Sequence, residues 1–210
     1  MGICNSCKAR IKYIEQPRCM RCGKPLANSE QEYCRDCGKK NFAYDQGQSL
    51  WLHQKEVARG IYQFKFHNKR IYAKIFAGEW TTRYDTQLRR WQVQEIIPIP
   101  LHPSKRRQRG YNQAGLLAEE LGRQTGLLVN QKAVFRIRKT RPQKELDGFE
   151  RVQNLKDAFG VSKSWKPKKS VLLVDDIYTT GNTINRVAKL LKKAGAEKVY
   201  FLTISIGQGL

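Results

Sequence analysis

The sequence has few acidic residues. It holds 18 Asp and Glu against 40 Lys and Arg, which leaves a formal net charge of +22 on 210 residues. An excess of this size repels itself unless it faces a polyanion, so nucleic acid, phosphorylated ligands and anionic membranes are the partner classes that fit it. An enzyme that handles one small molecule has no need of so many excess cations.

Long apolar runs are also absent. No stretch approaches the ~18 apolar residues that a membrane-spanning helix needs, and the N-terminal residues MGICNSCKAR lack the apolar core of a signal peptide. Apolar residues nevertheless make up 40% of the chain, which is enough to bury a core. We therefore expect a soluble cytoplasmic protein that consists of one ordinary domain and a small module.

Cysteine does not occur after residue 37. The six cysteines form three C-x-x-C pairs near the N-terminus, and two such turns can direct four thiolates at one zinc ion. Glycine directly follows the second cysteine in CMRCGK and CRDCGK, which suits a tight turn. Disulfides are disfavoured in a cytosolic chain, and a segment this short has no adequate core, so we expect a structural zinc ion. The best set of ligands is Cys19, Cys22, Cys34 and Cys37.

The remaining pair, Cys4 and Cys7, is unexplained because six thiolates do not divide into fours. The pair could join Cys19 and Cys22 instead, belong to a second and incomplete site, or have lost a partner pair upstream. Loss of the metal should loosen the N-terminal module and leave the rest of the chain folded, since the rest has a core of its own.

Residues 44–92 have a helical character. The stretch EVARGIYQFKFHNKRIYAKIFAGEW carries apolar residues near helical spacing, and KFHNKR marks a turn between two helices. Aromatic residues alternate here with basic ones, so they could stack the bases of a single nucleic-acid strand or fill the core of a helical hairpin. His53 and His67 have no partner at ligand spacing. The aromatic residues are Trp51, Tyr62, Phe64, Phe66, Tyr72, Phe76, Trp80, Tyr84 and Trp91.

The C-terminal part of the chain alternates strand and helix patterns. Such alternation predicts an α/β fold with a parallel sheet and right-handed crossovers. Ligands of such sheets bind beyond the carboxyl ends of the strands. We expect strands at 93–100, 133–138, 171–174 and 198–205, and helices at 112–126, 148–159 and 183–196. The predicted domains are a metal-binding module at 1–43, a helical connecting or hood region at 44–92 and the α/β domain at 93–210.

The stretch VLLVDDIYTTGNT places two carboxylates, Asp175 and Asp176, directly after a buried strand. Small hydroxyl residues and a glycine follow and lead into a helix. Adjacent carboxylates suit the hydroxyls of a ribose, whereas a loop at a helix N-terminus offers hydroxyls and backbone N–H groups to a phosphate. Together they predict a ribose-5-phosphate site.

This stretch resembles the phosphoribosyl diphosphate (PRPP) motif of type I phosphoribosyltransferases. PIPLHPSKRRQRGYNQA and RKTRPQKELDGFERVQNLKDAF resemble the ComF family of competence proteins, which typically carry an N-terminal zinc ribbon. The resemblance implies a type I phosphoribosyltransferase-like parallel sheet flanked by helices. It also implies that Asp175 and Asp176 bind the ribose hydroxyls and that Mg²⁺ bridges the pyrophosphate. The residues implied to hold the 5-phosphate are Thr179, Thr180, Gly181, Asn182 and Thr183. Relatives often carry four C-x-x-C pairs, and this chain has three.

Two basic loops follow strands at the sheet edge where Asp175 lies. Between His102 and Lys144 eleven residues are Lys or Arg, and the only acids are Glu119 and Glu120. A solvated basic face would have the same composition. In transferases of this type the second loop closes over the substrate and excludes water. The residues expected to meet pyrophosphate are Arg106, Arg107, Arg109, Arg138, Thr140 and Gln143. Those expected to meet DNA are Lys105, Arg106, Arg107, Arg109, Arg141 and Lys144.

The resemblance implies a competence protein that binds single-stranded DNA, partners a ComFA-like helicase and keeps a PRPP site. The alternative is an active phosphoribosyltransferase that transfers the phosphoribosyl group to an unknown base or other nucleophile. Against that alternative, no residue stands out as a general acid or base.

Overall fold

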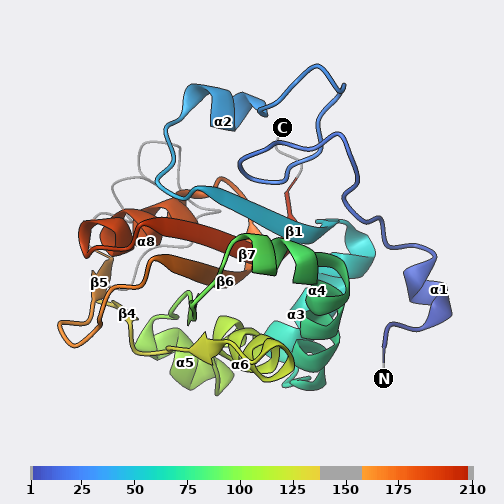
Figure 1. Ribbon diagram of the computed structural model, residues 1–210. Coiled ribbons are helices and arrows are strands. Elements are labelled where there is room, and N and C mark those ends of the chain that lie inside the picture. The colour runs from blue at the N-terminus through green and yellow to red at the C-terminus, as the bar shows by residue number, and fades with distance from the viewer. Residues whose placement is uncertain (1, 138–157, 208–210) are drawn as a thin grey trace.

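Five parallel strands form the central sheet of the computed structural model, which describes residues 2–137 and 158–207 (Figure 1). Their order across the sheet is β1-β7-β6-β2-β3. The strands are β1 (Gln46–Leu52), β2 (Glu95–Pro98), β3 (Leu128–Val129), β6 (Ser170–Tyr178) and β7 (Lys198–Ile206). The predicted α/β fold with a parallel sheet is confirmed. Three of its strands, β2, β6 and β7, lie in ranges that the sequence pattern predicted, whereas β1 and β3 were not predicted as strands.

Helices cover both faces of this sheet (Figure 1). Side chains alternate along a strand, so Leu172 and Val174 of β6 pack with α3, α4 and α6, whereas Val171 and Leu173 pack with α8 on the other face. Burial on both faces explains the unbroken apolar run VLLV. The helices are α3 (Lys55–Phe66), α4 (Ile71–Arg90), α6 (Gln113–Thr125) and α8 (Asn182–Lys193). None of the helices in the described ranges is both long and apolar enough to cross a membrane.

The region 44–92 is not helical throughout, because it begins with strand β1. This strand pairs with β7 along its length, from Gln46 opposite Tyr200 to Leu52 opposite Ile206. Its sequence, QGQSLWL, has too few apolar residues to show a strand period, and the contact with β7 makes it a strand. The two helices predicted after it are confirmed as α3 and α4, and the residues 67–70 form the turn between them.

The strand predicted at 133–138 does not join the parallel sheet. Instead, β4 (Val134–Arg136) pairs antiparallel with β5 (Phe159–Val161) in a separate two-stranded sheet, and β3 takes the place beside β2. A strand of three residues has too short a sequence pattern to predict which strand it pairs with. The helix predicted at 148–159 falls mostly outside the described residues, and its last position, Phe159, begins β5.

The first basic segment is a short helix rather than a loop. Helix α5 (Pro103–Arg109) begins after His102, whose side chain accepts a hydrogen bond from the backbone N–H of Ser104. Proline is favourable in the first turn, where its missing N–H is not needed. The helix ends at Gly110, whose φ of 80° suits glycine. The basic side chains of α5 therefore project from an ordered element.

The N-terminal residues form a small module with two short helices, α1 (Asn5–Lys8) and α2 (Arg35–Lys39). The module lies along the outer edge of the sheet, beyond β1 (Figure 1). The backbone N–H of Gly47 donates to the carbonyl of Arg21 at 2.8 Å, and the Gln46 amide donates to the carbonyl of Met20 at 2.8 Å. The module thereby covers a strand edge that would otherwise be open to other chains.

Candidate functional site

Asp175 and Asp176 lie in the last part of β6, which pairs with β7 but extends past the end of β2. Strand β2 ends at Pro98, opposite Val174, whereas β6 continues beside β7 as far as Tyr178. Both aspartates are partly buried. The two carboxylates therefore lie at the carboxyl edge of the sheet, one or two residues past the end of β2, where a ligand can approach.

Burial of its carboxyl group raises the pKa of Asp175 to about 7, and the negative charge of Asp176 acts in the same direction. The backbone N–H of Asp176 donates to Asp175 Oδ1 at 2.9 Å and opposes the rise, as do the charges of Lys65 and Arg136. A cation or hydroxyl group bound here would stabilise the ionised form.

Lys65 is a site residue that the sequence analysis missed. Its Nζ lies 2.8 Å from Asp176 Oδ2, and the two side chains are only 17% and 15% exposed. Lys65 belongs to the last turn of α3, more than a hundred residues before Asp176 in the chain. No local pattern could have indicated this pair, since only the packing of α3 over the sheet brings the two charges together.

The residues after β6 form a tight turn into α8. Gly181 precedes the helix with a φ of 75°, and a Cβ there would lie 2.4 Å from the Tyr178 hydroxyl oxygen. The hydroxyl of Thr180 is buried, and no hydrogen-bond partner reaches it among the described residues. The first backbone N–H groups of α8 also lack partners within the helix. This turn offers the donors that a phosphate requires, and it holds Thr179, Thr180, Gly181, Asn182 and Thr183 together.

A basic groove of about 520 Å³ lies beyond the end of β2, at the carboxyl edge of the sheet. Arg106 and Arg107 of α5 line it together with Phe135 and Arg136 of β4. Burial lowers the pKa of Arg136, and the nearby charge of Asp175 acts against that shift. Arg136, another side chain that the sequence analysis did not select, therefore lines the groove and also lies within electrostatic range of Asp175.

The other basic residues selected from the sequence differ in their surroundings. Lys105 is partly buried on α5. Arg109 lies over the ring of Phe66, with its guanidinium carbon 4.7 Å from the ring centroid. The remaining selected positions lie outside the described residues, and they are Arg138, Thr140, Arg141, Gln143 and Lys144.

The four cysteines predicted to bind zinc come together in one buried cluster. Their sulfur atoms all lie within 4.8 Å of one another, and the Sγ atoms of Cys22 and Cys34 are 3.7 Å apart. Tetrahedral zinc with Zn–S distances of ~2.3 Å requires sulfur atoms ~3.8 Å apart. An ion pair of 3.1 Å between Lys24 and Asp36 joins the two cysteine turns. These residues fit a structural zinc ion held by Cys19, Cys22, Cys34 and Cys37.

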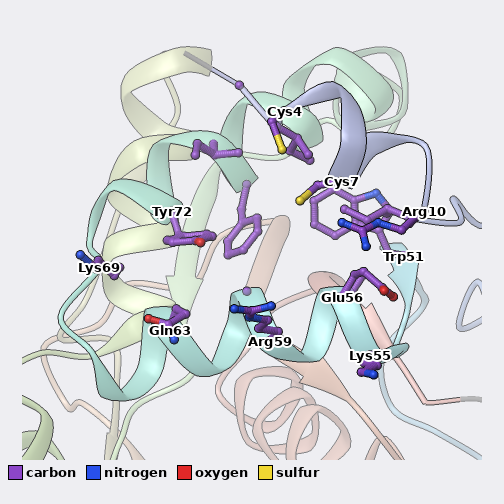
Figure 2. A pocket seen from close by; sticks show the side chains of 17 residues that line it. Cys4, Cys7, Arg10, Trp51, Lys55, Glu56, Arg59, Gln63, Lys69 and Tyr72 are labelled. Atoms are coloured by element: carbon purple, nitrogen blue, oxygen red, sulfur yellow. The ribbon is translucent and has the colours of Figure 1, made fainter.

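Cys4 and Cys7 lie apart from this cluster, so the pairing with Cys19 and Cys22 is wrong. Both side chains turn toward a cavity of about 790 Å³ that Trp51 and Tyr72 also line (Figure 2). A hydrogen bond with Ser6 lowers the pKa of Cys4 to about 7. Within residues 2–137 and 158–207, no third His, Cys, Asp or Glu completes a metal cluster with this pair.

Comparisons with known proteins agree with both parts of this architecture. A double zinc ribbon domain matches residues 1–38, and a phosphoribosyl transferase domain matches residues 108–205. The chain is 34% identical over 203 residues to competence protein F of Haemophilus influenzae, covering 94% of this chain and 87% of the relative.

Two further relatives cover nearly the whole chain. It is 28% identical to competence protein ComFC of Streptococcus pneumoniae, with 94% of this chain and 84% of that protein covered. It is 29% identical to the DNA utilization protein YhgH of Escherichia coli, with 94% and 87% covered. Among solved structures, an adenine phosphoribosyltransferase overlaps 66% of this chain and 74% of its own, with a TM-score of 0.42 and 15% identity.

Proposed function

Since the chain belongs to the family of competence protein F and ComFC, we propose that it acts in the cytoplasm during natural transformation, where it binds incoming single-stranded DNA and partners a ComFA-like helicase. Its phosphoribosyl transferase domain would bind PRPP with Mg²⁺ at the turn between β6 and α8. Co-sedimentation of the two purified proteins, with and without single-stranded DNA, tests the helicase partnership.

The observation that carries the DNA role is the position of helix α5. Its exposed Arg106 and Arg107 line a groove at the sheet edge that holds the aspartates, in a protein with a net charge of +22. Arginine binds phosphate through a planar fork of N–H groups, and phosphate contacts position a strand without reading its sequence. Lys105 and Arg109 extend the same basic helix.

We expect the Arg106→Ala, Arg107→Ala variant to bind single-stranded DNA with a weaker dependence on salt. Each phosphate contact contributes ~0.7 to the slope of log affinity against log salt, so two lost contacts lower the slope by ~1.4. Fluorescence anisotropy at several salt concentrations measures this slope. The matched control is Arg89→Ala, Arg90→Ala, which removes the same charge from the exposed end of α4. Equal slopes for the two variants would place the DNA elsewhere.

The proposal that the protein binds PRPP rests on the polar groups at the end of β6 and in the turn that follows it. Asp175 and Asp176 would bind the ribose hydroxyls, and Thr180 has a buried hydroxyl without a partner in the described part of the chain. The basic groove beside them would take the pyrophosphate together with Mg²⁺, which prefers oxygen ligands and keeps contacts to substrate phosphates. Lys65 would hold Asp176 in place while the ligand binds.

The Asp175→Asn, Asp176→Asn variant should bind PRPP more weakly by at least ten- to a hundred-fold. The change keeps the size of both side chains but removes hydrogen bonds to charged groups, which are worth ~1.5–3 kcal/mol each. Isothermal titration with Mg²⁺ present gives the affinity. Asp85→Asn on the surface of α4 serves as the control, since the exposed Asp85 pairs with Arg89 of the same helix. Unchanged PRPP affinity of the double variant would show that the ribose assignment is wrong.

An active phosphoribosyltransferase is the second candidate. The observation in its favour is the phosphate turn itself, because Gly181 and the buried Thr180 hydroxyl preserve a cradle that a DNA scaffold does not need. Pyrophosphate release from PRPP and Mg²⁺, measured with each common nucleobase in turn, tests this activity. Competition between PRPP and single-stranded DNA in the anisotropy assay shows whether the two ligands share one site.

A further inference from the structure

Helix α3 ends in a cluster of aromatic side chains that takes no part in the candidate PRPP site between β6 and α8. Tyr62 and Phe66 are 54% and 53% exposed, and their ring centroids are 5.0 Å apart with the planes inclined at 43°. The ring of His67 lies 5.3 Å from that of Tyr62. Phe64, which lies between them in sequence, is fully buried. Tyr62, Phe66 and His67, here called the aromatic cluster, therefore occupy the solvent-facing side of the helix end, one turn apart.

One arginine contacts the aromatic cluster, and two further cations lie close to it in the chain. The guanidinium carbon of Arg109 lies 4.7 Å from the centroid of the Phe66 ring, at the distance of a cation–π contact. The Nη1 atom of Arg109 also donates to Gln113 Oε1 at 3.1 Å, which fixes the arginine on this side of α5 and α6. Lys69 and Arg70 come two and three residues after His67 in the chain, and both are exposed.

The aromatic cluster also adjoins the candidate PRPP site. Lys65 precedes Phe66 by one residue, and its ammonium group lies 2.8 Å from Asp176. The last turn of α3 thus presents one side chain to the aspartates of β6 and the next to solvent. Arg109 connects the same turn to α5, whose Arg106 and Arg107 line the basic groove.

We propose that Tyr62 and Phe66 stack unpaired bases of a single strand of DNA, while the arginines of α5 hold its phosphates. This inference rests on the proposed DNA binding and specifies where the bases lie. Single-strand binding sites combine a basic track for the backbone with aromatic rings for the bases, and such stacking tolerates every sequence because each base has a π-face. A protein partner fits this surface less well, since lysine is depleted in protein interfaces and the exposed Lys69 lies two residues beyond the cluster.

The test separates bases from phosphates by comparing two strands of equal length and charge. One is oligothymidylate, and the other carries abasic tetrahydrofuran units at every position. The unmodified protein should bind oligothymidylate more tightly than the abasic strand. In the Phe66→Leu variant the affinity for oligothymidylate should fall about 5- to 100-fold, the range for loss of one stacked base, with little change for the abasic strand. Combining it with Tyr62→Leu should make the two affinities nearly equal.

Three controls sharpen this experiment. Phe66→Trp keeps a stacking face and should restore the preference for strands with bases. Tyr33→Leu removes an equally exposed ring, 44% exposed and also beneath an arginine, from the N-terminal module, and it should change nothing. The salt slope should stay unchanged in Phe66→Leu, unlike in the Arg106→Ala, Arg107→Ala variant.

Three results overturn the inference. If oligothymidylate and the abasic strand bind the unmodified protein equally, or if Phe66→Leu, Tyr62→Leu keeps the full preference, the bases lie elsewhere while the proposed DNA binding stands. If the unmodified protein binds neither strand, the DNA role itself fails and the stacking role fails with it. Circular dichroism and melting curves confirm that each variant is folded, as expected for side chains that are half exposed.

Discussion

Asp175 occupies a position that disfavours its own charge. The carboxyl group is buried beside Asp176, and together these effects raise its pKa from 3.8 to about 7. The folded protein therefore holds a proton on Asp175 that the unfolded chain releases between pH 4 and pH 7. Stability falls as the pH rises through this window, because the folded state binds more protons than the unfolded state. Such a cost is common at ligand sites, where a bound group offsets it.

The Asp175→Asn variant should be more stable than the parent protein at pH 8 and nearly equal to it at pH 4. Each pKa unit is worth ~1.4 kcal/mol, so the gain at high pH should be on the order of 2–4 kcal/mol. Asparagine keeps the oxygen that accepts the N–H of Asp176. Urea unfolding of both proteins from pH 4 to pH 8 measures the difference. A difference that does not vary with pH would mean that Asp175 titrates normally in the folded protein.

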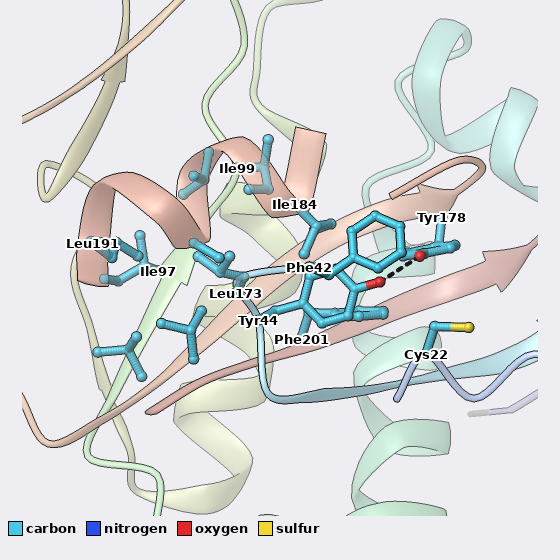
Figure 3. Packing of buried hydrophobic residues seen from close by; sticks show 14 of the residues in the cluster. Cys22, Phe42, Tyr44, Ile97, Ile99, Leu173, Tyr178, Ile184, Leu191 and Phe201 are labelled. Atoms are coloured by element: carbon cyan, nitrogen blue, oxygen red, sulfur yellow. Dashed lines mark hydrogen bonds between the residues drawn. The ribbon is translucent and has the colours of Figure 1, made fainter. Parts of the chain in front are cut away.

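At the scale of elements, the segment that joins the N-terminal module to β1 is hydrogen-bonded to residues on both sides of the turn between β6 and α8. The hydroxyls of Tyr44 and Tyr178 are 2.7 Å apart and fully buried (Figure 3). The backbone N–H of Ala43 donates to the Asn185 side chain of α8 at 2.7 Å. Tyr178 is also the residue against which Gly181 packs. The position of this turn therefore depends on a segment far away in the sequence.

Replacement of Tyr44 by Phe should lower the free energy of unfolding by ~1–3 kcal/mol, because it leaves the Tyr178 hydroxyl buried without a partner. Tyr178→Phe should have a similar effect for the same reason. The double variant should be about as stable as either single variant, since two apolar edges then face each other. Denaturant unfolding of all four proteins completes the cycle. Strictly additive losses would show that the two hydroxyls do not interact.

At the scale of the whole molecule, the zinc cluster and the sheet share one core. The four cysteines belong to the same buried cluster as residues of β6, β7 and α8. Cys22 lies near Tyr44 and Phe201 in this packing (Figure 3). Because the core is continuous, we no longer expect the N-terminal module to loosen on its own when the metal is lost. A single cooperative transition is expected where one core is continuous.

Removal of zinc should therefore destabilise the entire protein. A loss of even ~3 kcal/mol would lower the melting temperature by ~6–12 °C for a chain of this size. Calorimetry with and without a chelator measures the shift, and elemental analysis should find about one zinc per chain. The Cys34→Ser, Cys37→Ser variant should lose the metal, whereas the matched Cys4→Ser, Cys7→Ser variant should keep it. An unchanged transition of the α/β part after zinc removal would show that the two parts unfold independently.

The sequence alone determined the features that depend on neighbours in the chain. The spacing of Cys19, Cys22, Cys34 and Cys37 indicated the metal site, because two turns with this spacing can hold one ion. The run VLLV indicated a buried strand, and the residues after it indicated a turn into a helix. Helical periodicity located α3, α4, α6 and α8. Each of these signals is local, since a turn, a strand face or a helix face is set by residues a few positions apart.

Only the tertiary structure decided which distant side chains meet. It made 46–52 a strand through pairing with β7, and it turned the basic segment before Gly110 into a helix beside the groove. It also decided which aromatic residues of α3 are buried: Phe64 lies in the core, whereas Tyr62 and Phe66 are exposed. It also brought Lys65 to Asp176. These outcomes depend on how elements pack across the sheet. The contacts involved join residues from separate segments, so no single stretch of the sequence can predict them.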